Sequence, residues 1–131
     1  VTQETLSETC IEMPRFDYPR YNLRADYRYV YGIGVNQSQP RGFYNQIVKI
    51  DVQTAHTATW YEDACYPGEP VFVPAPNART EDEGVLLSVV LDIERRYSFL
   101  LVLDAATLEE QARALVPQGI LFGFHGAYFE A

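Results

Sequence analysis

Few side chains in this 131-residue chain could take part in metal or thiol chemistry. The chain has two histidines, His56 and His125, and two cysteines, Cys10 and Cys65. The cysteines lie far apart and lack the C-x-x-C spacing of zinc sites and redox dithiols. We therefore expect reduced thiols, with a single disulfide as the alternative. Two histidines are too few for a complete His-rich metal site, so the chain alone predicts none.

Taken one at a time, the candidate ligands have ordinary structural explanations. His125 lies in the apolar segment 121–126, where a single histidine is typical of a core residue whose ring bonds to a carbonyl group. Glu12 by itself is typical of a solvated charge, and Glu69 lies between a glycine and a proline, as turn residues do. His56 lies in a polar stretch and is interpreted as a surface residue.

The composition indicates one ordinary globular domain, 1–131. Apolar residues make up 47% of the chain and charged residues 21%, close to globular averages. The net charge is -8 and the one lysine is Lys49. This argues against a nucleic-acid partner, because phosphate backbones bind clusters of basic residues. The longest uncharged apolar run, 99–103, is far too short to cross a membrane, so we expect no membrane span.

The elements that must position these residues are mostly strands, because apolar residues alternate along much of the chain. Tyr27, Tyr29 and Tyr31 form an aromatic face, and Gly32 and Gly34 leave space for a closely packed segment. A proline-bounded strand is expected at a sheet edge, and the acidic stretch before residue 85 is interpreted as a solvated loop. The expected strands cover residues 27–35, 43–51, 57–61, 70–74, 85–91 and 98–103.

The segment after Leu103 allows two interpretations. Thr107 and Glu110 match a helix capping box, which favours a short helix. The alternative is a tight turn over 104–107 followed by a strand over 109–116. We favour the strand, because short strands at regular spacing are typical of an all-β protein.

Repeated four-stranded meanders are typical of β-propeller blades, each about 40–45 residues long. On that basis this chain holds about three blades at most, whereas closed propellers have typically four to eight. The pattern therefore predicts either a small sandwich or a piece of a larger propeller.

Four motifs in order point to one family. They are Ile-Glu-Met-Pro-Arg at 11–15 followed by the tyrosine strand at 27–32, Tyr-Pro-Gly-Glu-Pro-Val-Phe-Val-Pro at 66–74, Glu-Asp-Glu-Gly and the apolar run at 81–90, and Leu-Phe-Gly-Phe-His-Gly at 121–126. Together they resemble the C-terminal part of the carotenoid cleavage oxygenases. That family includes apocarotenoid oxygenases, lignostilbene dioxygenases and the retinoid isomerase of the retinal pigment epithelium. The resemblance implies an all-β chain forming C-terminal blades of a seven-bladed β-propeller, incomplete here.

The resemblance also implies a metal centre. In the family, four histidines from different blades hold Fe(II), and glutamates orient three of them. His125 matches the last iron ligand, and Glu12 and Glu69 match two of the orienting glutamates. Phe124, beside the ligand, is assigned to the substrate tunnel. The other three histidines are expected in an N-terminal part that this sequence lacks.

One contact follows from this assignment. We expect Glu69 to serve His125, with its carboxylate about 2.7–3.2 Å from Nδ1. Both side chains should face the propeller axis and not bulk solvent. Glu12 should serve a histidine of the missing part.

The implied function is oxidative cleavage of a conjugated C=C double bond by dioxygen, with an apolar carotenoid, apocarotenoid or stilbene-like substrate. The isolated segment should be inactive. The alternative is a non-enzymatic module derived from a propeller, with a binding or assembly role, and isomerase or hydrolase activity is a minor variant of the enzyme. Expected partners are the remaining N-terminal part of the propeller and, for the segment alone, further copies of itself. We expect a cytoplasmic location and leave peripheral membrane contact open.

Overall fold

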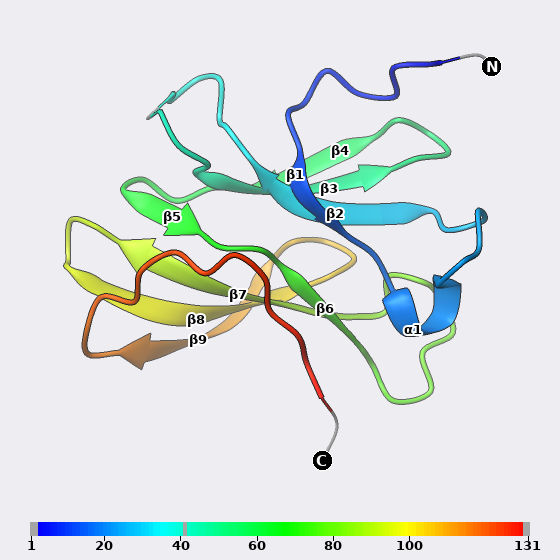
Figure 1. Ribbon diagram of the computed structural model, residues 1–131. Coiled ribbons are helices and arrows are strands. Elements are labelled where there is room, and N and C mark those ends of the chain that lie inside the picture. The colour runs from blue at the N-terminus through cyan, green and yellow to red at the C-terminus, as the bar shows by residue number, and fades with distance from the viewer. Residues whose placement is uncertain (1–2, 41, 130–131) are drawn as a thin grey trace.

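The computed structural model describes residues 3–40 and 42–129 and is built almost entirely of strands (Figure 1). One helical turn, α1 (Tyr18–Tyr21), follows the first strand. The strands are β1 (Glu12–Arg15), β2 (Tyr29–Gly34), β3 (Gln46–Asp51), β4 (Thr57–Trp60), β5 (Cys65–Pro67), β6 (Val71–Pro74), β7 (Gly84–Asp92), β8 (Tyr97–Asp104) and β9 (Glu110–Val116).

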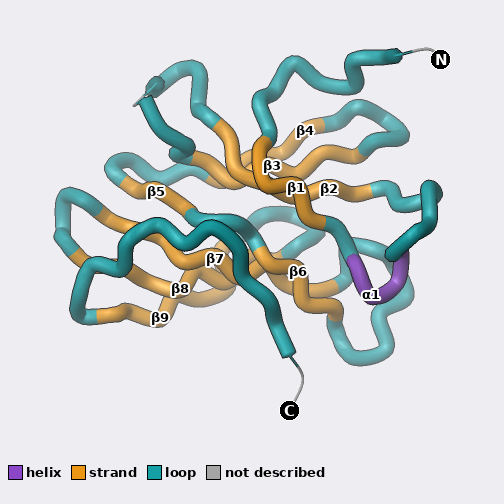
Figure 2. Tube along the Cα trace, viewed as in Figure 1, coloured by secondary structure: helices purple, strands orange, loops and turns teal. Residues whose placement is uncertain are grey.

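The strands form two antiparallel sheets (Figure 2). The first has the order β1-β2-β3-β4. The second has the order β5-β7-β8-β9, and β6 also pairs with β7, beyond the residues that pair with β5. β6 therefore lies at a sheet edge, as its flanking prolines predicted. The first sheet is a meander of sequential strands, and β7, β8 and β9 form a meander in the second. The expected all-β class is confirmed.

Most of the buried core lies between the two sheets. Leu86, Phe99 and Leu101 of the second sheet are fully buried. Tyr31 of β2 is buried beside them and stacks on Phe72 of β6, with ring centroids 5.7 Å apart. Burial raises the pKa of Tyr31, and its hydroxyl donates a hydrogen bond to the Ala105 carbonyl. Tyr31 therefore packs the first sheet against the second.

The glycines of β2 allow β1 to approach closely. A Cβ atom at Gly32 would lie 2.6 Å from the backbone oxygen of Glu12, and one at Gly34 would lie 2.4 Å from that of Cys10. Both distances are shorter than side-chain carbons permit. The space predicted from these glycines is therefore filled by the chain that carries Glu12.

The segment after Leu103 is a turn followed by a strand, so the favoured interpretation is confirmed. The Asp104 carboxylate accepts hydrogen bonds from the backbone N–H groups of Ala106 and Thr107, both at 2.9 Å. Leu108 then adopts a positive φ of 61°, which redirects the chain into β9. The turn stabilised by Asp104 therefore forms in place of the helix that the capping-box pattern favoured.

The acidic run before β7 is a loop, as expected, but Glu81 and Asp82 within it are bonded to the first sheet, so the expectation that they are solvated was wrong. Glu81 accepts backbone hydrogen bonds from Arg28 and Tyr29 at 2.8–2.9 Å. Asp82 forms an ion pair with Lys49 at 2.7 Å. Both carboxylates therefore connect the second sheet to the first.

Three elements were not expected from the sequence: β1, α1 and β5. They are short, with four, four and three residues. Segments of this length show too little periodicity to be recognised, and tertiary contacts stabilise them. In the part of the chain that the structure describes, no helix has the length and apolarity needed to cross a membrane.

Both cysteines are unpaired, as expected, with Cys10 exposed and Cys65 buried. His56 is exposed in the turn between β3 and β4, which confirms its assignment to the surface.

Candidate functional site

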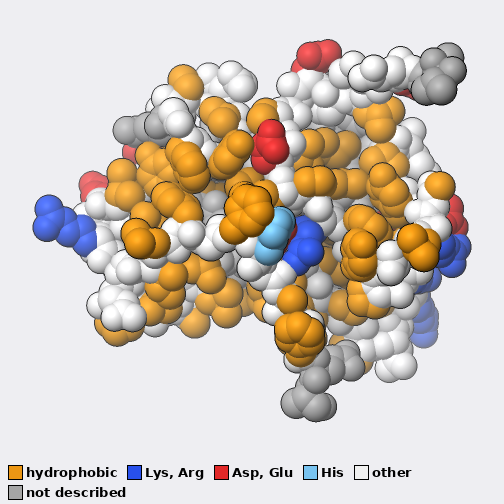
Figure 3. Space-filling model, in the orientation of Figure 1, with side chains coloured by type: hydrophobic (Ala, Val, Ile, Leu, Met, Phe, Trp, Pro, Cys, Tyr) orange, Lys and Arg blue, Asp and Glu red, His pale blue; other side chains and the backbone are white. Residues whose placement is uncertain are grey.

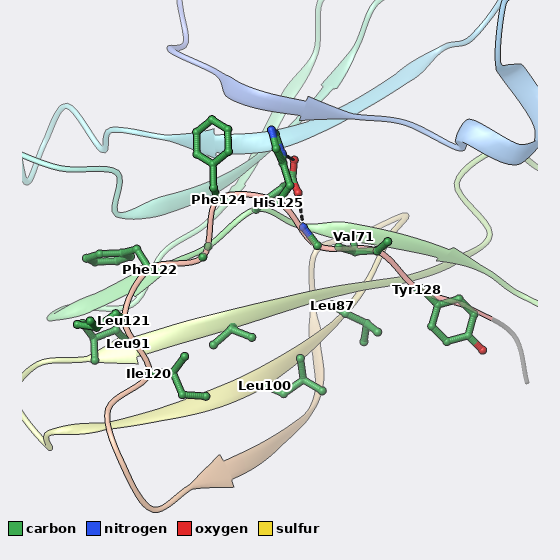
Figure 4. Close-up of a pocket in the computed structure, with 16 residues that line it drawn as sticks. Val71, Leu87, Leu91, Leu100, Ile120, Leu121, Phe122, Phe124, His125 and Tyr128 are labelled. Atoms are coloured by element: carbon green, nitrogen blue, oxygen red, sulfur yellow. Dashed lines mark hydrogen bonds and ion pairs between the residues drawn. The ribbon is translucent and has the colours of Figure 1, made fainter.

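The candidate site lies where the C-terminal segment, 117–128, crosses the outer face of the second sheet (Figure 1). A cavity of about 280 Å³ lies between this segment and the strands. Apolar side chains of β7 and β8 line one wall, including Leu87, Leu91 and Leu100. Figure 4 shows Phe122, Phe124 and the other labelled residues of the segment along the opposite wall.

Glu69 and His125 both line this cavity, and Figure 4 shows His125 next to Phe124 on the C-terminal segment. The His125 Nδ1 atom lies 2.9 Å from the Glu69 Oε1 atom. The Gly126 backbone N–H donates to the other carboxylate oxygen, Oε2, at 3.0 Å. Both carboxylate oxygens of Glu69 are therefore directed toward the same two-residue segment.

Arg15 of β1 completes the cluster. Its Nε atom lies 3.4 Å from Glu69 Oε1, and its guanidinium also donates a hydrogen bond to the Gly126 carbonyl oxygen. The Glu69 side chain is 4% exposed. A buried carboxylate is stable only where hydrogen bonds or opposite charge replace its hydration. Here His125, Gly126 and Arg15 supply both.

The backbone around Glu69 is fixed by β7. The Gly68 N–H donates to the Val89 carbonyl at 2.9 Å, and the Ser88 hydroxyl donates to the Gly68 carbonyl at 2.8 Å. Pro70 restricts the backbone on the other side of Glu69. The carboxylate therefore projects from a segment that the sheet holds on one side and a proline ring on the other.

The C-terminal segment is held to the sheet by polar and aromatic contacts. The Ile120 N–H donates to the Ser98 hydroxyl of β8 at 2.9 Å. Phe122 packs on Phe43, with ring centroids 4.6 Å apart. The Phe124 ring meets the His125 ring edge-on at 4.3 Å. These contacts bring His125 to Glu69 although the segment has no regular secondary structure.

This arrangement fits one ligand position of a metal centre. When Nδ1 carries the proton and donates it to Glu69, the Nε2 lone pair is available to a metal ion. Within residues 3–40 and 42–129, Nε2 makes no hydrogen bond. Neutral imidazole nitrogen suits Fe(II). The donor set therefore fits an iron site in part, with one imidazole ligand and its orienting carboxylate.

The expected contact between Glu69 and His125 is confirmed at 2.9 Å. The expectation that both face away from solvent holds for Glu69 alone, because the His125 side chain is 60% exposed. Phe124 lines the same cavity and is 70% exposed.

Glu12 is not brought into this cluster. It is exposed on β1, opposite Ile33 of β2, and it forms no hydrogen bond or ion pair with Glu69 or His125. Its expected partner was a histidine outside this sequence, so its assigned role stays a prediction.

Sequence reasoning missed Arg15. It belongs to the Ile-Glu-Met-Pro-Arg motif, and that membership was the one available signal. Its contact with Gly126 joins residues 111 positions apart. A local sequence pattern carries no information about a contact between residues so far apart in the chain.

A second acidic cluster is structural. One potential ligand atom from each of Glu62, Cys65 and Asp92 lies within 4.8 Å of the others. Glu62 pairs with Arg113, and Asp92 pairs with Arg95, each at 2.7 Å. Burial raises the pKa of Cys65 to about 12, so its thiol stays protonated at neutral pH. Arginines already neutralise this cluster.

Comparison with known proteins gives consistent matches over nearly the whole chain. The family model of the retinal pigment epithelial membrane protein matches residues 1–130. The human mitochondrial carotenoid-cleaving dioxygenase is 42% identical over 128 residues, which are 96% of this chain and 21% of that protein. The chicken beta,beta-carotene 15,15'-dioxygenase is 44% identical over 119 residues, or 90% of this chain and 22% of that protein.

Solved structures agree. A variant of the Synechocystis apocarotenoid oxygenase superimposes with a TM-score of 0.89 at 27% identity, covering 96% of this chain and 26% of that chain. The cobalt-substituted form of that oxygenase gives the same values. These neighbours are β-propellers, so the two sheets are blades of a propeller that is incomplete in this chain, as predicted. The chain spans about a fifth of the curated relatives' length.

Proposed function

The chain belongs to the retinal pigment epithelial membrane protein family, the carotenoid cleavage oxygenases, and from this membership we propose that it is part of a non-haem Fe(II) dioxygenase. The intact protein would cleave a conjugated C=C bond of a carotenoid, apocarotenoid or stilbene-like substrate. The relatives named above are carotenoid dioxygenases and an apocarotenoid oxygenase, which supports the reaction class.

In this proposal His125 supplies one iron ligand through Nε2. The observation that carries it is the buried Glu69 carboxylate, which contacts His125 Nδ1 and the Gly126 N–H together. Glu69 keeps the proton on Nδ1 and fixes the direction of the ring. Bound Fe(II) would supply dioxygen binding and activation.

Two further residues have roles in the proposal. Phe124, beside the ligand, belongs to the substrate tunnel, and the apolar cavity next to it suits an apolar substrate. Glu12 orients a histidine from the rest of the propeller. The backbone oxygen of Glu12 lies so close to Gly32 that a Cβ atom there would have no room. This close packing supports a fixed position for the strand that carries the Glu12 carboxylate.

The isolated chain should be inactive, because one imidazole cannot hold Fe(II) where the family uses four. The remaining N-terminal part of the propeller is therefore a required partner. The alternative of a non-enzymatic module gives no reason for a buried carboxylate to hold an exposed imidazole. A cytoplasmic location is also a proposal, supported by two unpaired cysteines.

The test is Glu69→Gln in the intact protein, with Glu94→Gln as the matched control on an exposed turn. Glutamine keeps the shape of Glu69 but loses its charge. We expect iron affinity to fall about 10–100-fold, as measured by iron content after dialysis against graded chelator. The control should match the wild type. An unchanged iron affinity in Glu69→Gln, or wild-type protein without iron, would contradict the proposal.

A further inference from the structure

The Glu69 carboxylate needs a positive charge beside it. Its side chain is 4% exposed, and its hydrogen-bond partners, the His125 ring and the Gly126 N–H, supply no permanent positive charge. Arg15 is the cation that contacts this carboxylate within the described part of the chain, with Nε 3.4 Å from Oε1. Without it, the buried carboxylate would lose the opposite charge that offsets the cost of its burial.

Arg15 also holds the backbone beside the ligand. Its guanidinium donates to the Gly126 carbonyl oxygen, while the Gly126 N–H donates to Glu69. Gly126 is therefore hydrogen-bonded on both sides. Its N–H donates to the Glu69 carboxylate, and its carbonyl oxygen accepts from the Arg15 guanidinium. These two hydrogen bonds restrict the backbone immediately after His125. This restriction also limits the directions that the imidazole ring can take.

The conformation of β1 brings Arg15 to this position. The pairing of β1 with β2 shifts register between Glu12 and Arg15, and Met13 between them has a positive φ of 50°. A non-glycine residue in this region is strained, and such strain is typically maintained by the surrounding structure. Successive side chains point to opposite faces along a regular strand. The register shift therefore changes the direction in which the Arg15 side chain points relative to that of Glu12.

We propose that Arg15 is a positioning residue for the iron ligand His125, an inference that rests on the function proposed above. Arg15 contacts the Glu69 carboxylate that bonds to Nδ1, and it donates a hydrogen bond to the Gly126 carbonyl oxygen. Because the same strand carries Glu12, Arg15 also joins the strand holding one orienting glutamate to the segment holding His125. The two parts of the proposed metal centre, the strand that carries Glu12 and the segment that carries His125, are thereby held in a fixed relative position.

The geometry requires arginine and not merely a positive charge. The guanidinium uses Nε for the carboxylate and a terminal nitrogen for the carbonyl. A lysine has a single ammonium group and no rigid fork, so it cannot reproduce both contacts in the same geometry.

The experiment uses the intact protein loaded with Co(II), because a solved relative carries cobalt. The variants are Arg15→Gln and Arg15→Lys, with Arg79→Gln as the control at an exposed arginine and His125→Ala as the reference for a lost ligand. The readouts are cobalt affinity, the visible d–d spectrum, which reports ligand geometry, and the unfolding temperature.

We expect Arg15→Gln to bind cobalt about tenfold more weakly or worse, in the range of lost ligand-orienting contacts, with altered d–d bands. Arg15→Lys should remain weaker than the wild type, and Arg79→Gln should match it. Adding Arg15→Gln to Glu69→Gln should cause little further loss, because both act on the same contact. A stabilising role alone would lower the unfolding temperature without altering the bands.

The outcomes separate the two proposals. Wild-type protein that binds no cobalt would overturn the proposed function itself. Wild-type binding together with an unchanged affinity and spectrum in Arg15→Gln would overturn the role of Arg15. If Arg15→Gln does not fold, Arg15→Lys decides: wild-type affinity and bands overturn the two-contact role, and weaker binding with altered bands supports it.

Discussion

At the scale of single residues, burial decides which side chains are chemically available. The Glu69 carboxylate is buried and fully engaged, so it can orient a neighbour but offers no free oxygen to solvent. The His125 side chain is 60% exposed, and within the described residues its Nε2 atom makes no hydrogen bond. Burial separates the two cysteines in the same way.

We predict that Cys10 reacts with thiol reagents in the folded protein and that Cys65 does not. Cys10 is exposed, whereas Cys65 is buried, and burial raises its pKa to about 12. A thiol with this pKa stays protonated, and therefore unreactive, from pH 7 to about 10. Iodoacetamide labelling and peptide mass mapping of the intact protein would measure the modification of each cysteine.

Cys10→Ser is the control and should remove labelling at these two positions. Both cysteines of the wild type should react after denaturation. Rapid native labelling of Cys65 at pH 8 would show that its burial is not maintained in solution.

At the scale of elements, close contacts hold the strands where the site needs them. β1 lies so close to β2 at Gly32 that a Cβ atom there would have no room. The two sheets are joined by Lys49, whose ammonium contacts Asp82 and the Ala106 carbonyl at 2.7 and 2.8 Å and lies 4.3 Å from the Tyr29 ring centroid.

We predict that Gly32→Ala displaces β1. The new methyl group would lie 2.6 Å from the Glu12 carbonyl oxygen, so the strand must move. The expected loss of stability is about 1–3 kcal/mol, the usual cost of overpacking, and iron affinity should fall because Glu12 moves. Urea unfolding and iron content of the intact protein would measure both effects.

Gly119→Ala is the matched control, since a Cβ atom there would make only an ordinary contact with Leu91 at 3.8 Å. Equal stability and equal iron content in the two alanine variants would refute the prediction.

We predict that Lys49→Met weakens the contact between the sheets. The Lys49 and Asp82 side chains are 7% and 15% exposed, so the substitution leaves a largely buried carboxylate without its cation. The expected loss of stability is about 3–5 kcal/mol. Adding Asp82→Asn should recover part of it, because the amide carries no charge.

Arg24→Met is the control for Lys49→Met, because Arg24 pairs with Asp26 on the surface, where both side chains are more than half exposed. Such an exposed pair contributes little to stability, because solvent screens the two charges. Chemical denaturation of all four proteins would give the comparison, and a Lys49→Met loss no larger than that of Arg24→Met would contradict the prediction.

At the scale of the whole molecule, the described part of the chain exposes many large apolar side chains. Figure 3 shows hydrophobic side chains spread over the face viewed. Exposed examples include Val89 of β7, Leu115 of β9, and Leu121, Phe122 and Phe124 of the C-terminal segment. Open strand edges at β4 and β9 add unpaired backbone groups.

We predict that the isolated 131-residue chain associates with itself. Burying apolar surface is favourable, and open edges promote strand pairing between chains. Light scattering over a range of concentrations should show species larger than a monomer, and metal analysis should find no stoichiometric iron. A clean monomer at all concentrations would refute the first expectation, and tight stoichiometric iron would refute the second.

The sequence by itself determined the strands with strong local patterns. The apolar runs at 85–91 and 98–103 indicate burial, and the glycines at 32 and 34 indicate close approach of a neighbouring segment. Their signal lies within a few residues, so it could be interpreted without a structure. Four ordered motifs added the family, and with it the pairing of Glu69 with His125.

Only the tertiary structure decided how distant segments meet. The acidic residues Glu81 and Asp82 looked solvated because their partners, Arg28, Tyr29 and Lys49, lie far away in the chain. Arg15 had no assigned role for the same reason. Hydrogen bonds and ion pairs between remote segments depend on how the sheets pack, and a local pattern of residues does not encode that packing.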